Sequence, residues 1–248
     1  MTSKLLYGNE WYTASSVTSP GIAPSPETNV CFIWGTNPAW AMPFSFDRLR
    51  NLKARGVKFV VVDPRVTPTV HSFADVHLQL RPGTDGAMAL GLAHIIIRDG
   101  NYDKEMVEKW VHGFEEYKEY VKQFTPEKTA EITGVPVERI EKAAAMTAGG
   151  PIIVKTAPAF GHHTNGVNNY RAMMMLVPLT GSLDVPGGHA IINEPLPIDL
   201  WEGTYEFARS PVLLPKIRHN RADQKYFPVW ADLDEQGTVQ LNKLPEYV

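Results

Sequence analysis

The sequence predicts an α/β fold: a doubly wound, mostly parallel, Rossmann-like sheet with extra short helices and irregular terminal arms. The β-branched run Val60-Val61-Val62, which ends a predicted strand over 58–62, stops at Asp63, and the chain then turns through Pro64. A parallel strand delivers a carboxylate to the ligand-binding edge of a sheet in this way. A short apolar run, 29–34, precedes it by one helical segment, and this β-loop-α-β order implies a crossover between parallel strands.

Four strands and a series of helices are expected in order along the chain. The segment 44–54 has helical spacing, with Gly56 as its stop. After Asp63 we expect a loop as far as Asp75, a half-buried strand over 76–80, and a helix over 86–98 that Asp85 opens and Gly100 closes. The remaining elements are short helices at 103–111, 114–123, 126–132 and 136–147, a buried strand at 152–155, and a helix at 167–179. Thr125 is the expected N-cap before Pro126, and Pro136 is placed in a first helical turn.

Segment composition divides the chain into three parts. Residues 1–28 are rich in Ser, Thr, Pro and Gly without periodicity, which predicts an irregular N-terminal arm. Residues 29–189 hold all the predicted elements and form one α/β domain. Residues 190–248 hold many prolines and aromatic residues but few periodic runs, so we expect an irregular C-terminal extension.

Composition excludes several classes of protein. The chain has 248 residues, of which 44% are hydrophobic and 21% are charged, and this is enough to form a full hydrophobic core. The net charge is -3 and there is no block of basic residues, so nucleic acid is a poor candidate partner. No apolar run approaches the roughly 18 to 20 residues that span a bilayer, and the first residues lack a secretory signal. We therefore expect a soluble protein without direct membrane insertion, cytoplasmic or periplasmic. Cys31 stands alone, which excludes an internal disulfide or a cluster of several thiolates, and it is interpreted as a small buried hydrophobe.

Polar turns follow three of the predicted strands, at residues 35–38, 63–65 and 161–166. In an open parallel sheet these turns meet at the carboxyl edge, where helix N-termini offer unpaired N–H groups to a phosphate. This geometry favours a dinucleotide. The Gly-x-Gly-x-x-Gly fingerprint and the P-loop are both missing, which argues against an ordinary nicotinamide dehydrogenase or a P-loop NTPase.

A set of short motifs occurs in one order along the chain: Trp34-Gly35-Thr36-Asn37-Pro38, Val61-Val62-Asp63-Pro64-Arg65, Ala74-Asp75, Arg81-Pro82-Gly83-Thr84-Asp85, Asn165-Gly166 with Arg171, and Leu179-Thr180-Gly181 through Pro186-Gly187-Gly188. Each motif alone is a weak signal, but the ordered set is strong. Over residues 29–189 the chain resembles the dinucleotide-binding domain of the molybdopterin oxidoreductases, the dimethyl sulfoxide reductase and formate dehydrogenase superfamily.

The resemblance implies a cofactor and the residues that bind it. In that family molybdenum or tungsten lies between two molybdopterin guanine dinucleotides, and this domain holds one of them. By resemblance Gly35, Thr36 and Asn37 line the diphosphate, and Asp63 accepts hydrogen bonds from the ribose or the guanine edge. Further cofactor contacts are implied for Arg65, Thr67 and Arg81 at the phosphates and sugar, Gly83 beside them, Asp85 at guanine N–H groups, and His163, Asn165 and Arg171 toward the pterin. No catalytic residue or metal ligand is implied within this chain.

Each of these residues also has a purely structural interpretation. Asp63 can end its strand and cap a turn, and Asp85 can be the N-cap of its helix, with or without a ligand role. Arg65 and Arg81 can pair with Asp75 or another surface acid. The adjacent His162 and His163 suggest a metal, but neighbouring loop histidines do not converge on one ion, and no Glu or Cys stands at useful spacing. The three methionines at 173–175 are interpreted as core filling.

The chain also departs from the family. Its single cysteine cannot ligate the 4Fe-4S cluster of such enzymes, and Ser182 follows Thr180-Gly181 where the family has asparagine. We therefore expect a fragment, inactive alone, of a parent enzyme that transfers electrons and often an oxygen atom to or from a small substrate. Its partners are then the remaining domains of the parent subunit, which carry the 4Fe-4S cluster, and an iron–sulfur electron-transfer subunit. The alternatives are a non-catalytic nucleotide-binding module and a nicotinamide-dependent dehydrogenase with an unusual fingerprint.

Overall fold

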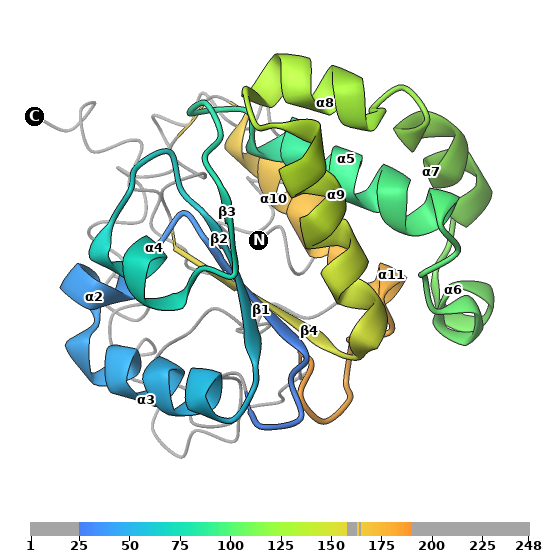
Figure 1. Cartoon of the computed structure of the whole chain (residues 1–248). Coiled ribbons are helices and arrows are strands. Elements are labelled where there is room, and N and C mark those ends of the chain that lie inside the picture. Colours follow the sequence, from blue (N-terminus) through green and yellow to red (C-terminus); the bar gives the residue numbers. More distant parts are fainter. Residues whose placement is uncertain (1–24, 158–162, 164, 190–248) are drawn as a thin grey trace, which may run out of the picture. The chain divides into compact units, whose positions relative to one another are not determined.

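The computed structural model of the chain describes residues 25–157, 163 and 165–189. Their centre is a parallel four-stranded sheet in the order β3-β2-β1-β4, visible in Figure 1. The strands are β1 (Val30–Trp34), β2 (Lys58–Val62), β3 (Val76–Leu78) and β4 (Ile152–Thr156). The strand predicted at 76–80 is two residues shorter than expected. The predicted arm over 1–28 falls almost entirely outside the described residues, and the extension over 190–248 falls wholly outside them.

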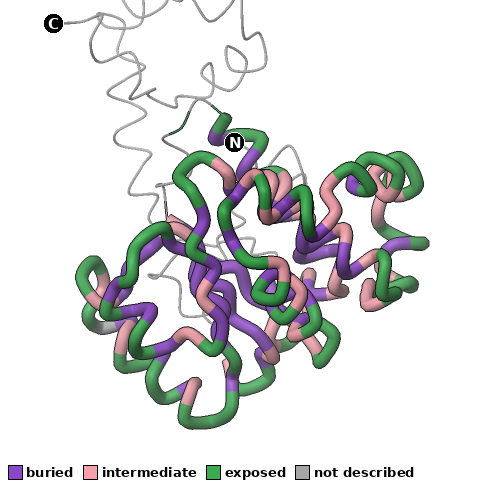
Figure 2. Tube along the Cα trace, turned by 45° about the horizontal axis from the view of Figure 1, so that its top comes forward, coloured by how far each residue is buried: buried purple, intermediate pink, exposed green. Residues whose placement is uncertain are grey.

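Helices cover both faces of the sheet, which confirms the doubly wound α/β fold. On one face α5 (Asp85–Arg98), α9 (Val137–Ala145), α10 (Gly166–Met174) and α11 (Leu176–Leu179) pack over alternate strand residues such as Phe32, Trp34 and Val60. On the other face α3 (Pro43–Ala54) and α4 (Pro68–Phe73) enclose Ile33, Phe59 and Val61. The strands are buried along their length except at Lys58 in β2, which is exposed, and at His77 in β3, which is half-buried (Figure 2). Cys31 is fully buried, and burial raises the pKa of its thiol to about 12.

Of the remaining helices, α7 (Phe114–Val121) and α8 (Pro126–Thr133) pack against α5, and α6 (Lys104–Trp110) packs against α11. The short helix α2 (Pro38–Ala41) packs against α3 and α4, and the 3-10 turn η1 (Met146–Gly149) packs against α9. The predicted N-cap of α8 is confirmed, because the Thr125 hydroxyl accepts from the Lys128 N–H at 3.2 Å. Gly56, with φ at +99°, follows the end of α3 as predicted. No described helix has both the length and the apolar character that crossing a membrane requires.

Three expectations about local structure are wrong. The segment after Asp63 is not a loop throughout, because Thr67 caps α4 with its hydroxyl and Pro68 starts that helix. The helix expected over 167–179 is split at Met175 into α10 and α11, since Pro178 cannot donate a hydrogen bond within a continuing helix. Pro136 occupies the N-cap before α9, one residue ahead of its first turn.

The outer side of β4 is closed by side chains that come after α11. Among the described strands β4 pairs only with β1, so the N–H groups on its other side need different partners. The N–H of Ile152 donates to Ser182 Oγ at 2.9 Å, and the N–H of Val154 donates to His189 Nε2 at 2.8 Å. The segment that carries the Thr-Gly-Ser and Pro-Gly-Gly motifs therefore seals the edge of the sheet.

Candidate functional site

The turns after β1 and β2 lie at one carboxyl edge, as the sequence predicts. Trp34 is level with Val62 on one side and with Thr156 on the other, so β1, β2 and β4 end at the same height. The Gly35 N–H donates to the Val62 carbonyl at 3.0 Å, which holds the two turns side by side. Any ligand bound at this edge meets the residues after β1 and after β2 together.

Asp63 is buried at this edge, with 4% of its surface exposed. Its Oδ1 accepts from the Arg65 N–H at 2.8 Å, and the Arg65 Nε lies 3.7 Å from the same oxygen. The carbonyl of Asp63 contacts His77 Nε2 at 2.9 Å. The turn-capping interpretation is therefore confirmed, while Oδ2 makes no hydrogen bond to any residue that the structure describes and is available to a ligand.

Asn37 is the second buried polar group of the edge. Its Oδ1 accepts from the Thr69 hydroxyl of α4, whose oxygen in turn accepts from the Ala39 N–H at 3.2 Å. Its Nδ2 is buried and finds no hydrogen-bond partner within the described part of the chain. Because an unpaired buried amide donor is costly, this atom fits an oxygen acceptor supplied by a ligand. Thr36 beside it is also buried, whereas the Thr67 hydroxyl is used in capping α4.

The turn after β2 carries an exposed cation over an exposed aromatic ring. The Arg65 guanidinium lies 6.0 Å from the centre of the Trp40 ring, which belongs to α2. The side chain of Arg65 is 64% exposed, and Trp40 is 67% exposed. Arg65 therefore stays near Asp63, as one of the two interpretations expected, while its charge remains accessible to solvent.

Asp85 lies at the start of α5 but is not its N-cap, which corrects that interpretation. Thr84 occupies the cap position and makes no side-chain cap hydrogen bond. Asp85 is instead the first helical residue, and its Oδ1 accepts from Trp34 Nε1 at 2.8 Å in a buried contact that joins β1 to α5. The N–H of Gly86 donates to Asn169 Oδ1 at 3.2 Å, so α10 supplies the capping group.

Replacing Asp85 by alanine should lower the free energy of unfolding by about 1 to 3 kcal/mol, because a buried indole N–H loses its acceptor. Urea unfolding measures the change. Asp47→Ala is the matched control, since Asp47 on α3 is 77% exposed and, among the described residues, forms only a surface ion pair with Arg50. Equal stability of the two variants would show that the contact of Asp85 with Trp34 contributes nothing.

Arg81 has a structural role that the sequence did not suggest. Its Nη1 donates to the carbonyls of Glu131 and Ile132, at 2.8 and 3.0 Å, at the C-terminal end of α8. Asp75, the acid considered for it, is 3.3 Å from Lys53 instead. Gly83 lies in the turn that follows, with φ at +84°. A cofactor role for Arg81 would have to use its other guanidinium nitrogens.

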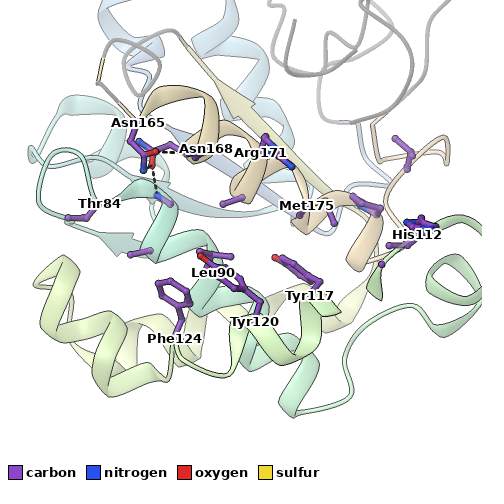
Figure 3. A pocket seen from close by; sticks show the side chains of 18 of the residues that line it. Thr84, Leu90, His112, Tyr117, Tyr120, Phe124, Asn165, Asn168, Arg171 and Met175 are labelled. Carbon is purple, nitrogen blue, oxygen red and sulfur yellow. Dashed lines mark hydrogen bonds between the residues drawn. The ribbon is translucent and has the colours of Figure 1, made fainter. Parts of the chain in front are cut away.

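A groove of about 940 Å³ runs from the N-termini of α5 and α10 toward α6 and α7 (Figure 3). Three predicted site residues line it: Gly83, Asn165 and Arg171. Tyr117 points into it from α7, and its hydroxyl, like Asn169 Nδ2, is buried without a hydrogen-bond partner in the described residues. The residues after β1 and β2 do not line this groove, so the predicted site divides into a carboxyl-edge part and a groove part.

His163 belongs to neither part. It is exposed, and its carbonyl accepts from the Gly166 N–H at 2.9 Å, just before α10. His162 lies outside the described residues. Within the ranges that the structure describes, no group of three or more His, Cys, Asp or Glu side chains is placed to hold a metal ion. The methionines at 173 and 174 are buried in the core, as interpreted from the sequence, but Met175 is only half-buried and lines the groove instead.

Sequence reasoning missed several residues that build the site. His77 supports the Asp63 turn, and Asn169 caps α5. The signal for Asn169 was its place one turn after Asn165, on the same side of a helix. Trp40 comes two residues after the Gly-Thr-Asn-Pro turn, and a large aromatic residue near such a turn was the signal for it.

Comparison with known proteins identifies the family. The sequence model of the molybdopterin oxidoreductases matches residues 7–231. The probable oxidoreductase YoaE of Bacillus subtilis is 33% identical over 96% of this chain and 34% of its own length. Formate dehydrogenase H of Escherichia coli is 35% identical over 67% of this chain and 23% of its own length.

A solved structure agrees with the sequence matches. Acetylene hydratase from Pelobacter acetylenicus superposes with a TM-score of 0.59 at 38% identity, over 64% of this chain and 22% of that one. The chain thus spans about a third or less of the length of these relatives. The family match extends through nearly the whole sequence and agrees with the fold and with the ordered motifs. The chain therefore belongs to the molybdopterin oxidoreductase family.

Proposed function

We propose that the chain binds one molybdopterin guanine dinucleotide at the carboxyl edge of its sheet, as part of a molybdenum or tungsten oxidoreductase. The observation that carries the proposal is Asn37 Nδ2, which is buried at this edge without a partner among the described residues. Beside it, the buried residue Asp63 makes no hydrogen bond through its Oδ2 to any described residue. A phosphate oxygen can satisfy the first, and a ribose hydroxyl or guanine N–H can satisfy the second.

The residues of this chain would bind and orient the cofactor. Gly35, Thr36 and Asn37 would hold the diphosphate, and Arg65 would offer its exposed guanidinium to a phosphate. Asp85, Thr67 and Arg81 already have structural hydrogen bonds, so any contact of theirs uses their remaining atoms. Asn165 and Arg171 would face the pterin end from α10. When bound, the cofactor supplies the electron transfer, and the protein supplies position and electrostatics.

The wider assembly follows from the same proposal. The chain matches only part of each relative's length, so it would act with further domains of a parent subunit that carry the second dinucleotide and a 4Fe-4S cluster. An iron–sulfur subunit would exchange electrons with that parent. The reaction would move electrons, and often an oxygen atom, to or from a small substrate, and this chain alone would be inactive.

Guanosine diphosphate should bind the folded chain, and Asp63→Ala should weaken this binding about 5- to 150-fold, since a charged hydrogen bond is worth about 1 to 3 kcal/mol. Isothermal titration calorimetry measures both affinities. Asp99→Ala is the control, because Asp99 follows the C-terminal end of α5, away from the carboxyl edge, and pairs with Arg98.

Two outcomes would contradict the proposal. The first is a folded chain to which guanosine diphosphate does not bind. The second is tighter binding of NAD⁺ than of guanosine diphosphate, which would favour the nicotinamide-dependent dehydrogenase. Equal affinities of the Asp63→Ala and Asp99→Ala variants would show that Asp63 does not contact the nucleotide, although the carboxyl edge could still be the binding site.

A further inference from the structure

Trp40 and Arg65 form an exposed aromatic–cation pair beside the carboxyl edge of the sheet. Trp40 has 67% of its surface exposed although it belongs to a helix at the edge of a well-packed domain. Tryptophan carries a large apolar area that folding normally buries, and exposed aromatic side chains beside polar groups are typical of binding surfaces. Arg65 lies over the ring without covering it, so ring surface remains accessible.

The backbone holds Trp40 firmly in this outward position. The N–H groups of Trp40 and Ala41 donate to the Asn37 carbonyl at 3.1 and 2.9 Å, and the N–H of Ala39 donates to Thr69 of α4. Thr69 is fully buried and also bonds Asn37. Figure 1 shows α2 and α4 side by side at the carboxyl end of the strands. The indole is therefore presented by a fixed scaffold beside the candidate site.

Three kinds of chemistry meet next to this indole. They are the indole of Trp40, the carboxylate of Asp63 and the guanidinium of Arg65. Arg65 lies between the other two, since its guanidinium is 6.0 Å from the centre of the Trp40 ring and its Nε is 3.7 Å from Asp63 Oδ1. A flat aromatic face favours stacking with a planar base, a carboxylate accepts from N–H groups on a base edge, and a guanidinium attracts phosphate. Guanine offers two adjacent N–H donors that a carboxylate can accept together, whereas adenine does not.

We propose that Trp40 is the stacking surface for the guanine base of the dinucleotide, with Arg65 over the indole and the Asp63 carboxylate at the base edge. This inference rests on the proposed function and adds a residue that recognises the base rather than the phosphates. In this proposal Trp40 contributes to the affinity for ligands that carry a base. A ligand that has only phosphate groups is bound by the turn after β1, without Trp40.

The test uses the chain with Trp40→Leu and the control Trp110→Leu, because Trp110 is 78% exposed at the end of α6 and lines the groove, not the carboxyl edge at which guanosine diphosphate would bind. Guanosine diphosphate should quench part of the tryptophan fluorescence of the wild type and of Trp110→Leu. In Trp40→Leu this quenching should be absent, because the indole that stacks on the base has been removed. Its affinity should fall about tenfold in Trp40→Leu, the loss expected for one base–aromatic stack. Trp40→Phe should keep most of the affinity, and inorganic pyrophosphate should bind all variants equally.

Different results separate this inference from the proposed function. Equal guanosine diphosphate affinity and quenching in the wild type and Trp40→Leu would overturn the stacking role while leaving the edge as a nucleotide site. An equal loss of pyrophosphate affinity in Trp40→Leu would also overturn it, since pyrophosphate has no base to stack. Absence of guanosine diphosphate binding to the wild type would overturn both proposals. Thermal melting of each variant verifies that the exposed substitution leaves the fold intact.

Discussion

Replacing Gly187 by alanine is expected to lower the free energy of unfolding by about 3 kcal/mol or more. Gly187 has φ at +80°, a conformation that strains any residue with a Cβ. A Cβ at this position would also lie 2.5 Å from the carbonyl carbon of Glu27 and 2.7 Å from the N–H nitrogen of Thr28. Both neighbours are backbone atoms, so only movement of the chain just before β1 can relieve the clash.

The structural setting explains why the effect should spread. The Thr28 hydroxyl donates to the Gly187 carbonyl at 2.8 Å, so the segment after α11 is bonded to the segment that leads into β1. Moving either one disturbs the first strand of the sheet or the side chains that close β4. The close packing against Glu27 and Thr28 therefore explains on steric grounds why glycine is needed at Gly187 in the Pro-Gly-Gly motif, independent of any ligand.

Urea unfolding followed by circular dichroism measures the change, and Gly100→Ala is the matched control. Gly100 has φ at +68°, but a Cβ there would meet no atom within 4 Å. That variant should lose only about 1 to 2 kcal/mol from backbone strain. The difference between the two variants is the cost of the backbone clash. Equal losses would show that the segment around Glu27 moves away without cost.

The fold could be predicted from the sequence because its signals are local. The β-branched runs identify β2 and β4, and Thr125 with Pro126 fixes the start of α8. The helix α4 was missed because it has only six residues, too few for a periodic pattern. Its helical form is instead supported by a cap at Thr67 and by burial of Val70 and Phe73, a tertiary effect.

The candidate site could be predicted only in part, for a similar reason. Parallel strands must end at one edge, so the meeting of the Gly35 and Asp63 turns followed from topology. The topology did not predict which hydrogen-bond partners the individual side chains have. Arg81 bonds carbonyls 50 and 51 residues away, and Asp85 bonds Trp34 across 51 residues. A single sequence carries no record of which distant backbone groups a fold brings to an arginine or a carboxylate.

Stability is expected to fall as the pH decreases from about 6.5 toward 3, with His189 as a main cause. This side chain is fully buried beside β4, and burial lowers the pKa of His189 to about 3. Its Nε2 accepts from the Val154 N–H, so the ring is neutral with its proton on Nδ1. Below about pH 6.5 the His189 side chain is protonated in the unfolded chain, whereas in the folded chain it stays neutral down to about pH 3. The stability is therefore complete above that pH and is lost progressively below it.

The size of the effect follows from the shift. Each pH unit between the two pKa values removes about 1.4 kcal/mol, so the wild type should lose about 2 kcal/mol between pH 6.5 and pH 5 through this group. His189→Gln is less stable at pH 7 but lacks the titration, and its loss over the same interval should be smaller by that amount. His71→Gln is the control, because His71 is exposed on α4. Parallel stability curves for the wild type and His189→Gln would show that His189 accepts a proton without leaving the sheet edge.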